Sequence, residues 1–224
     1  MSSIFQKPIL RTTQQDKFLV LSRTRMKDDR VCVGGCLLSS NRYVRILNKD
    51  ERNIASSEPY QICQIYDIDF YDRINIILPH IEDIIVIKRS FFRVMEYTEF
   101  MYKVNSLDLK LHCIKNLFEG ALNWQEYKGF LLKSKHVKGS VLISSLDYPL
   151  YKFENNPRHF SVKLEGEWYR IPYVGEKQLE DRVKIPDRTP IRFSLARWWT
   201  GHGHINPFGV AEERAYLQIS GFYI

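Results

Sequence analysis

The chain contains no run of about 18 consecutive apolar residues, which is the length that a membrane-spanning helix requires. Its first residues, Met1 to Lys7, also lack the basic and then apolar pattern of a secretion signal. We therefore expect a cytoplasmic protein that does not associate with a membrane.

Recognised catalytic motifs are absent as well. The sequence has no Gly-x-Ser-x-Gly, no Walker-type glycine loop, no His-Glu-x-x-His and no deaminase pairing of His-x-Glu with Cys-x-x-Cys. The scattered carboxylates of a nuclease would escape such a search, so an enzyme stays open while a non-enzymatic protein is favoured. No cofactor is predicted.

Cysteine is scarce, with four residues among 224. Three of the four lie in apolar runs typical of strands, where a thiol behaves as a small apolar side chain. Cys32 and Cys36 would stand about 13 Å apart along one face of a strand, too far to share a metal ion. We expect buried free thiols rather than disulfides, in keeping with a reducing cytosol.

The histidines and their neighbouring carboxylates match no established metal signature. His80, Glu82 and Asp83 lie in a proline turn, where the carboxylates can equally well accept backbone N–H bonds. His202 and His204, on a glycine-rich stretch, supply at most half of a zinc site. No metal site is predicted.

What the chain does have is an excess of positive charge, with 33 Lys and Arg against 26 Asp and Glu and a net charge of +7. Such a charge suits an anionic partner, although solubility alone can account for it. The basic residues form no tail but gather in two short segments, Lys128 to Lys138 and Arg182 to Arg197. Folding could place these two segments side by side.

The first third of the chain has the pattern of a curved β-barrel. Three apolar or β-branched runs between residues 18 and 47 are separated by polar turns. Gly34 and Gly35 interrupt the second run and predict a bulge or sharp bend, which a small barrel needs where a strand turns a corner. Ile62 to Phe70 alternates apolar and polar residues, as a half-buried strand does.

The period changes in the middle of the chain. Apolar residues from Phe100 to Phe118 recur at spacings of three and four, which predicts one face of a helix. Asn105 and Ser106 could divide it into two helices, because both residue types are good N-caps.

The strand pattern returns from about Trp124. A hairpin is predicted to turn at Glu165-Gly166-Glu167, and closing strands are predicted over residues 189–199 and 214–223. The glycine-rich stretch between them, residues 200–209, is predicted to be a loop at a barrel mouth, where OB folds commonly hold their ligands.

Four short elements of this chain recur in the same order in a known family: Arg25-Met26, Cys32 to Gly35, Arg42 to Arg45 and Pro79 to Asp83. On these elements the chain resembles the dual OB-domain family of prokaryotic proteins. The resemblance is good over residues 17–90 and thinner beyond, where it depends on residues 192–198 and 216–223.

The resemblance implies a mainly β protein with two OB-like barrels joined by a helical connector. The corresponding divisions are a first barrel over residues 17–92, a connector over 93–122 and a second barrel over 123–224. It also implies a role in binding nucleic acid or nucleotides, and a protein partner from a bacterial defence or conflict system.

Arginines and aromatic rings are the candidates for a nucleic-acid-binding role, with single strands favoured. Guanidinium groups hold phosphate oxygens with paired hydrogen bonds, and flat rings stack on bases. Neighbouring Trp198 and Trp199 face opposite ways on a strand, so a buried core accounts for one of them and not for both. The predicted binding residues are Arg23, Arg25, Arg42, Arg45, Arg192, Arg197, Trp198, Trp199, His202, His204 and Tyr216.

Other interpretations of the same residues stay open. The arginines near the N-terminus could be solvated strand ends paired with neighbouring acids. The whole protein could be a protein-interaction or regulatory subunit without affinity for nucleic acid. It could also be an enzyme acting on nucleotides through His202, His204 or the turn from Pro79 to Asp83.

Overall fold

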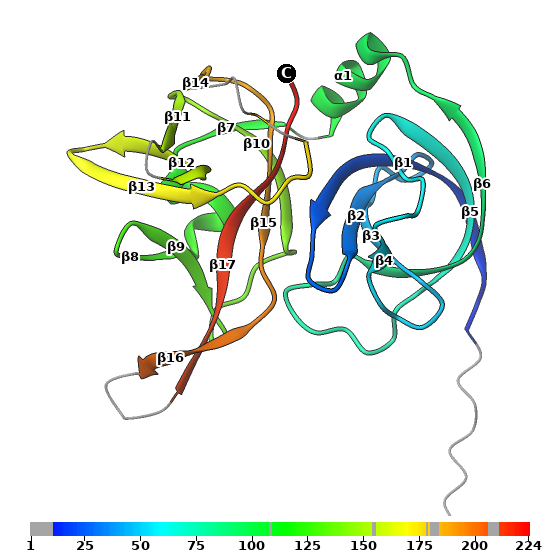
Figure 1. The fold of residues 1–224 in the computed structure, drawn as a ribbon, viewed down its shortest axis with the longest axis horizontal. Helices are drawn as coiled ribbons and strands as arrows, with labels where there is room; N and C mark the ends of the chain where they lie inside the picture. Colours follow the sequence, from blue (N-terminus) through cyan, green and yellow to red (C-terminus); the bar gives the residue numbers. More distant parts are fainter. Residues whose placement is uncertain (1–10, 108, 154–155, 178, 180–183, 206–210) are drawn as a thin grey trace, which may run out of the picture.

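The computed structural model describes residues 11–224 except 108, 154–155, 178, 180–183 and 206–210, and leaves out the side chains of residues 157 and 202–205. Two mainly β units lie side by side, and both contribute to one packed body (Figure 1). The prediction of a mainly β protein is confirmed.

The first unit is a closed five-stranded barrel. Its strands pair in the order β1, β2, β3, β6 and β5, and β5 returns to β1. Only β3 and β6 run parallel within this ring. A closed Greek-key barrel of five strands is the OB arrangement. The strands are β1 (Gln14–Arg25), β2 (Arg30–Leu37), β3 (Tyr43–Leu47), β5 (Gln64–Asp72) and β6 (Asp83–Val94), with β4 (Ile54–Ala55) added beside β2.

The sequence predicted a bulge or bend in β2 at its two glycines, whereas the bulge lies opposite them in β1. Gly35 pairs with Val20 and Gly34 with Ser22, so β1 carries one extra residue between the pairs. A Cβ added at Gly35 would lie 2.0 Å from the carbonyl oxygen of Leu19. The absence of a side chain there lets β1 and β2 approach closely enough for the barrel to close.

The second unit is an 11-stranded sheet that does not close on itself. The main path runs β14, β11, β12, β13, β9, β17, β15, β10 and β7, with β8 beside β9 and β16 beside β17. A second closed barrel is therefore not confirmed. The strands are β7 (Lys110–His112), β8 (Asn123–Gln125), β9 (Lys128–Leu132), β10 (Val141–Leu146), β11 (Leu150–Phe153), β12 (Asn156–Leu164), β13 (Glu167–Pro172), β14 (Lys184–Ile185), β15 (Ile191–Leu195), β16 (Trp199–Ile205) and β17 (Ala211–Phe222).

The predicted helix is only partly present, and a helical connector is not confirmed. Helix α1 (Tyr97–Ser106) buries Phe100 and Val104, as the spacing predicted. The chain then extends into β7, which pairs with β10, and turns again in the 3-10 segment η1 (Ile114–Gly120). Because β7 lies between them, the apolar residues of α1 and those of η1 pack into two different apolar clusters, although they follow one spacing in the sequence.

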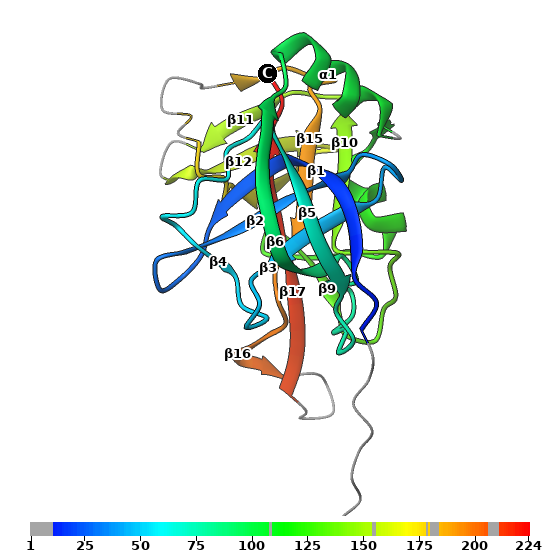
Figure 2. The same ribbon diagram turned by 90° about the vertical axis from the view of Figure 1, so that its right-hand side faces the viewer.

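A shared apolar cluster joins the two units. Phe100 of α1 packs edge to face against Tyr223 at the C-terminus, with ring centroids 5.7 Å apart. The Tyr223 hydroxyl donates a hydrogen bond to the carbonyl of Leu21 in β1 at 3.2 Å. Figure 2 looks onto the barrel and shows α1 lying across its end near the C-terminus. The units are thus held in a defined relative position.

The closing part of the chain differs from the prediction. The expected strand over residues 189–199 is divided into β15 and the start of β16. β16 then continues through six residues of the predicted loop, because it pairs with the beginning of β17. Residues 206–210 of that loop lie outside the described part. The predicted hairpin at Glu165-Gly166-Glu167 is confirmed as the turn between β12 and β13.

The four cysteines are free thiols, and Cys36 is fully buried. Burial raises the pKa of the Cys36 thiol to about 11. Among the described residues, the structure contains no helix that is both long and apolar enough to cross a membrane.

Candidate nucleic-acid interface

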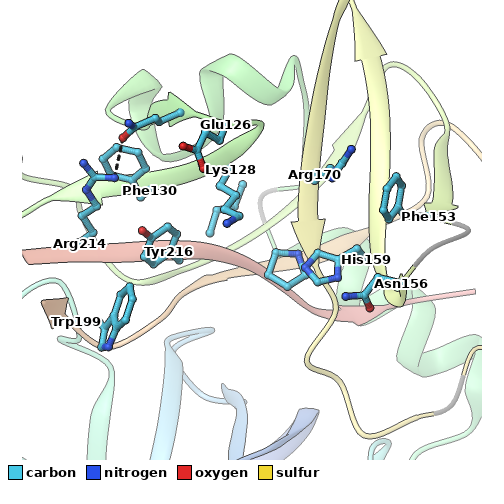
Figure 3. Close-up of a pocket in the computed structure, with 14 residues that line it drawn as sticks. Glu126, Lys128, Phe130, Phe153, Asn156, His159, Arg170, Trp199, Arg214 and Tyr216 are labelled. Atoms are coloured by element: carbon cyan, nitrogen blue, oxygen red, sulfur yellow. Dashed lines mark hydrogen bonds between the residues drawn. The ribbon is translucent and has the colours of Figure 1, made fainter. Parts of the chain in front are cut away.

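A groove of about 630 Å³ opens on the second unit between β9, the β12–β13 hairpin and the paired strands β16 and β17. Figure 3 shows its side chains, and we call this feature the groove. It is lined by Gln125, Glu126, Lys128, Gly129, Phe130, Phe153, Asn156, His159, Arg170, Pro172, Trp199, Arg214, Tyr216 and Leu217.

One wall of the groove carries a row of aromatic rings. Phe130 of β9 and Tyr216 of β17 are register partners, with ring centroids 5.8 Å apart. The ring of Trp199 follows at 6.1 Å from that of Tyr216, and its side chain is 53% exposed. Cross-strand pairing therefore places three rings in sequence, with the most exposed ring at the end (Figure 3).

Arg214 lies against this row of rings. Its guanidinium group is 4.1 Å from the centroid of Phe130. It donates hydrogen bonds to the side chains of Gln125 and Glu212, each at 2.8 Å. Glu212 also forms an ion pair with Nη2 of Arg214 at 2.7 Å, so these contacts hold the cation beside the ring and balance its charge.

The opposite wall carries a second stacked cation. The guanidinium group of Arg170 lies 4.0 Å from the ring centroid of Phe153 and 5.2 Å from that of Tyr127. Lys128 is the register partner of Arg170 where β9 and β13 run parallel. Within the described part of the chain, neither Arg170 nor Lys128 makes an ion pair.

His159 of β12 lines the groove close to these two cations. Burial lowers the pKa of His159, and the positive charges of Arg170 and Lys128 lower it further. The imidazole is consequently neutral at pH 7. Its Nδ1 is buried without a hydrogen-bond partner, so it keeps one unused polar atom at the groove.

Together the walls offer flat rings beside fixed positive charges. Rings stack on bases of any sequence, and guanidinium and ammonium groups hold phosphate oxygens. Glu126 is the carboxylate among the lining residues. The groove is chemically suited to an extended anionic chain that carries flat groups.

The predicted binding residues fall into several places rather than one. Trp199 and Tyr216 line the groove. Trp198, which precedes β16, faces away from the groove, so the two tryptophans face different ways as predicted, although only Trp199 lies on a strand. The Nε1 of Trp198 donates to the carbonyl of Leu78 at 2.5 Å. His202 and His204 lie in β16, but their side chains are outside the described part.

Arg45, Arg197 and Trp198 meet at a second cavity of about 280 Å³ where the two units join, which we call the junction cavity. Arg45 belongs to β3 of the barrel, and its Nε lies 2.5 Å from the Asp83 carboxylate. Arg197 comes from the segment between β15 and β16 of the second unit. The fold thus brings together Arg45 and Arg197, which are 152 positions apart in the sequence.

Three other predicted arginines lie at the contact between the units. Arg23 is buried, donates to the carbonyls of Ser56, Glu58 and Tyr60, and pairs with Glu176. Arg192 is 3% exposed and donates to the hydroxyl of Ser220 at 2.7 Å. The Nη2 of Arg25 donates to the Gly175 carbonyl at 3.4 Å. These contacts occupy the guanidinium groups within the fold.

Arg192 also explains the second glycine of β2. A Cβ at Gly34 would lie 2.4 Å from Nη2 of Arg192. Glycine at this position therefore leaves room for the arginine of the other unit. The remaining predicted arginine, Arg42, pairs with Asp72 at 2.7 Å on the outside of the barrel.

The turn from Pro79 to Asp83 is held by the protein's own contacts. Both carboxylate oxygens of Glu82 accept hydrogen bonds from Ser140 of the second unit. Asp83 binds Arg45 and Arg73. Within the described residues, no group of three or more His, Cys, Asp or Glu side chains is placed to hold a metal ion.

Sequence reasoning missed most of the groove. Lys128 had been singled out only as part of a basic segment, and Phe130, Phe153, His159 and Arg170 had not been singled out at all. The signal in the sequence was the spacing of Lys128 and Phe130, which puts a cation and a ring on one face of β9. The partners of these residues come from the hairpin and from β17, and the sequence does not give that pairing.

A family model described as a dual OB-containing domain matches residues 16–222. No curated protein and no solved structure matches the chain.

Proposed function

The chain belongs to the family of dual OB-containing domains, and from this premise we propose that it binds nucleic acid, with single strands favoured. The proposed contacts are phosphates held by Lys128 and Arg170 and bases stacked on Trp199 and Tyr216.

One observation carries the proposal: a row of three aromatic rings on one wall of the groove faces a second wall where a cation without an ion pair among the described residues lies over a ring. The row from Trp199 through Tyr216 to Phe130 ends on Arg214, and Arg170 lies on Phe153 opposite. A single strand can turn its bases onto such rings, whereas a duplex keeps its bases stacked inside.

We propose that the second unit is an OB-like barrel that has opened. Like the first unit, it contains a parallel pairing, here between β13 and β9 at Arg170 and Lys128. The groove lies along this pairing. The divisions at residues 17–92, 93–122 and 123–224 stay predictions, with β7 and η1 packing into the second unit.

A docking function is the second candidate, and one observation favours it. The loop between β5 and β6 exposes five aliphatic side chains, from 43% to 54% of each. Such a group of apolar side chains marks many protein-interaction sites. A protein partner from a defence system, which the family resemblance implies, would be a candidate for this loop, formed by Ile74, Ile76, Ile77, Leu78 and Ile81.

The proposed function is tested by fluorescence anisotropy with labelled single- and double-stranded DNA and RNA across a series of salt concentrations. Lys128 and Arg170 should neutralise about two phosphates, so log Kd of a single strand should change with log salt by about 1.4. Single strands should bind more tightly than duplexes of the same sequence. If the anisotropy of all four ligands does not change with protein concentration at low salt, the docking function is favoured over nucleic-acid binding.

A further inference from the structure

The junction cavity contains more positive than negative charge. Asp83 is shared between Arg45 and Arg73, and Arg73 also approaches Glu51 at 3.3 Å. The cavity lining comprises four cations and two carboxylates, which are Arg45, Arg73, Lys133, Arg197, Asp83 and Glu213.

Arg197 is the cation of the cavity that has no ion-pair partner among the described residues. Lys133 and Glu213 pair with each other, but Arg197 makes no ion pair or hydrogen bond with any described residue. Arg197 is an exposed residue at the cavity mouth, and partial burial of its guanidinium group lowers its pKa. The positive charges of Arg45 and Arg73 lower that pKa as well, and the Asp83 carboxylate raises it. A bound anion would reduce the repulsion among the three guanidinium groups.

His80 adds an unused polar group to the same cavity. The residue is 4% exposed, and neither ring nitrogen has a hydrogen-bond partner. The backbone carbonyl of Ala196 lies near the ring without forming a hydrogen bond of normal geometry. Burial lowers the pKa of His80 to about 4, so the ring is neutral at pH 7 and carries one N–H.

An imidazole buried in this way is costly unless something binds it. A buried polar atom without a partner costs about 1–3 kcal/mol, and native proteins keep few of them. His80 lines the cavity together with the unpaired Arg197. An anion that accepts hydrogen bonds would provide a partner for the N–H of His80 and a counter-charge for Arg197.

We propose that the junction cavity binds a phosphate group. A phosphate offers three or four oxygens, and the cavity provides guanidinium groups from Arg45, Arg73 and Arg197 and an N–H from His80. Guanidinium groups suit phosphate because their paired donors match its oxygens. The phosphate belongs either to a small molecule or to the end of a nucleic-acid strand.

The bound group would connect the two units. Arg45, Arg73 and His80 belong to the barrel and its loop, whereas Arg197 belongs to the second unit. The groove plays no part in these contacts, because Trp199 lines the groove and Trp198 lines the junction cavity. The inference therefore does not depend on the proposed nucleic-acid groove.

The test measures the effect of inorganic phosphate on the melting temperature and, by calorimetry, on binding, in a buffer matched for ionic strength with chloride. Phosphate should raise the melting temperature of the wild-type protein. Arg197→Ala should weaken phosphate binding by roughly 10- to 100-fold, since it removes one charged hydrogen-bonding group. Arg188→Ala, which removes an exposed arginine outside the cavity, should bind phosphate like the wild type.

A second variant separates ligand binding from a structural role. His80→Phe removes both unpartnered nitrogens but keeps a ring, so its stability without phosphate should equal or exceed that of the wild type. Its phosphate binding should nevertheless weaken. No effect of phosphate on the wild type, or equal effects on all four proteins, would overturn the proposal.

Two oligonucleotides of one sequence distinguish the source of the phosphate. A 5′-phosphorylated strand that binds more tightly than its 5′-hydroxyl form, with the difference lost in Arg197→Ala, assigns the cavity to strand ends. Equal binding of both strands together with binding of inorganic phosphate assigns it to a small phosphorylated ligand. A preference for the 5′-phosphate that persists in Arg197→Ala would contradict a phosphate site at this cavity.

Discussion

Replacing Lys128 and Trp199 together by alanine should weaken binding of a single strand by roughly 30- to 1,000-fold. Loss of one stacked base costs about 1–3 kcal/mol, and loss of one phosphate contact adds to it. Both side chains are exposed at the groove, so the variant should fold normally. Anisotropy titrations at constant salt measure the effect, and the salt dependence should fall by about 0.7 for the lost phosphate.

A matched control removes a lysine and a ring from the other unit. Lys88 and Phe92 are both exposed on β6 of the barrel, and Phe92 is 49% exposed. Lys88→Ala with Phe92→Ala should bind single strands like the wild type. If this control loses affinity and the groove variant keeps it, the interface belongs to the barrel and not to the groove.

Neutralising Asp83 should destabilise the protein by about 3–5 kcal/mol, because it leaves buried arginines without their counter-charge. The Asp83 side chain is 2% exposed, and the side chains of its partners Arg45 and Arg73 are 11% and 16% exposed. Asp83→Asn keeps the shape of the side chain and removes the charge. Urea unfolding of the wild type and the variant gives the change in the free energy of unfolding.

Asp72→Asn provides the comparison for that measurement. Asp72 pairs with Arg42 on the surface, with both side chains more than 40% exposed. A pair of this kind contributes about 0–1 kcal/mol. If both variants lose the same free energy of unfolding, Asp83 contributes no more to stability than a surface ion pair does.

Patterns along the chain predicted the strands of the barrel, and three of its pairings, β1–β2, β2–β3 and β5–β6, join successive strands. Alternation in Ile62 to Phe70 and the double glycine of β2 have local causes, the half-buried strand and the close approach of β1. The order of four short elements then indicated the family. What local patterns could not predict was β7, since its pairing with β10 depends on residues more than 30 positions away.

The binding residues were harder to predict for the same reason. Arginines look alike in a sequence whether they hold phosphate or the backbone of their own chain. Arg23 and Arg192 are occupied by contacts with distant parts of the protein, which no local pattern reveals. Trp198 and Trp199 were the informative pair, because the sequence predicted that they would face different ways, and they line different sites.

Photocross-linking of the wild-type protein to a short single strand carrying a photoreactive base tests the central claim most directly, with the cross-linked peptides identified by mass spectrometry. A base stacked in the groove should cross-link to the peptides of β9, β16 and β17 that carry Phe130, Trp199 and Tyr216. Cross-links confined to the strands of the barrel, or none at a concentration that saturates binding, would contradict the groove as the site of nucleic-acid recognition.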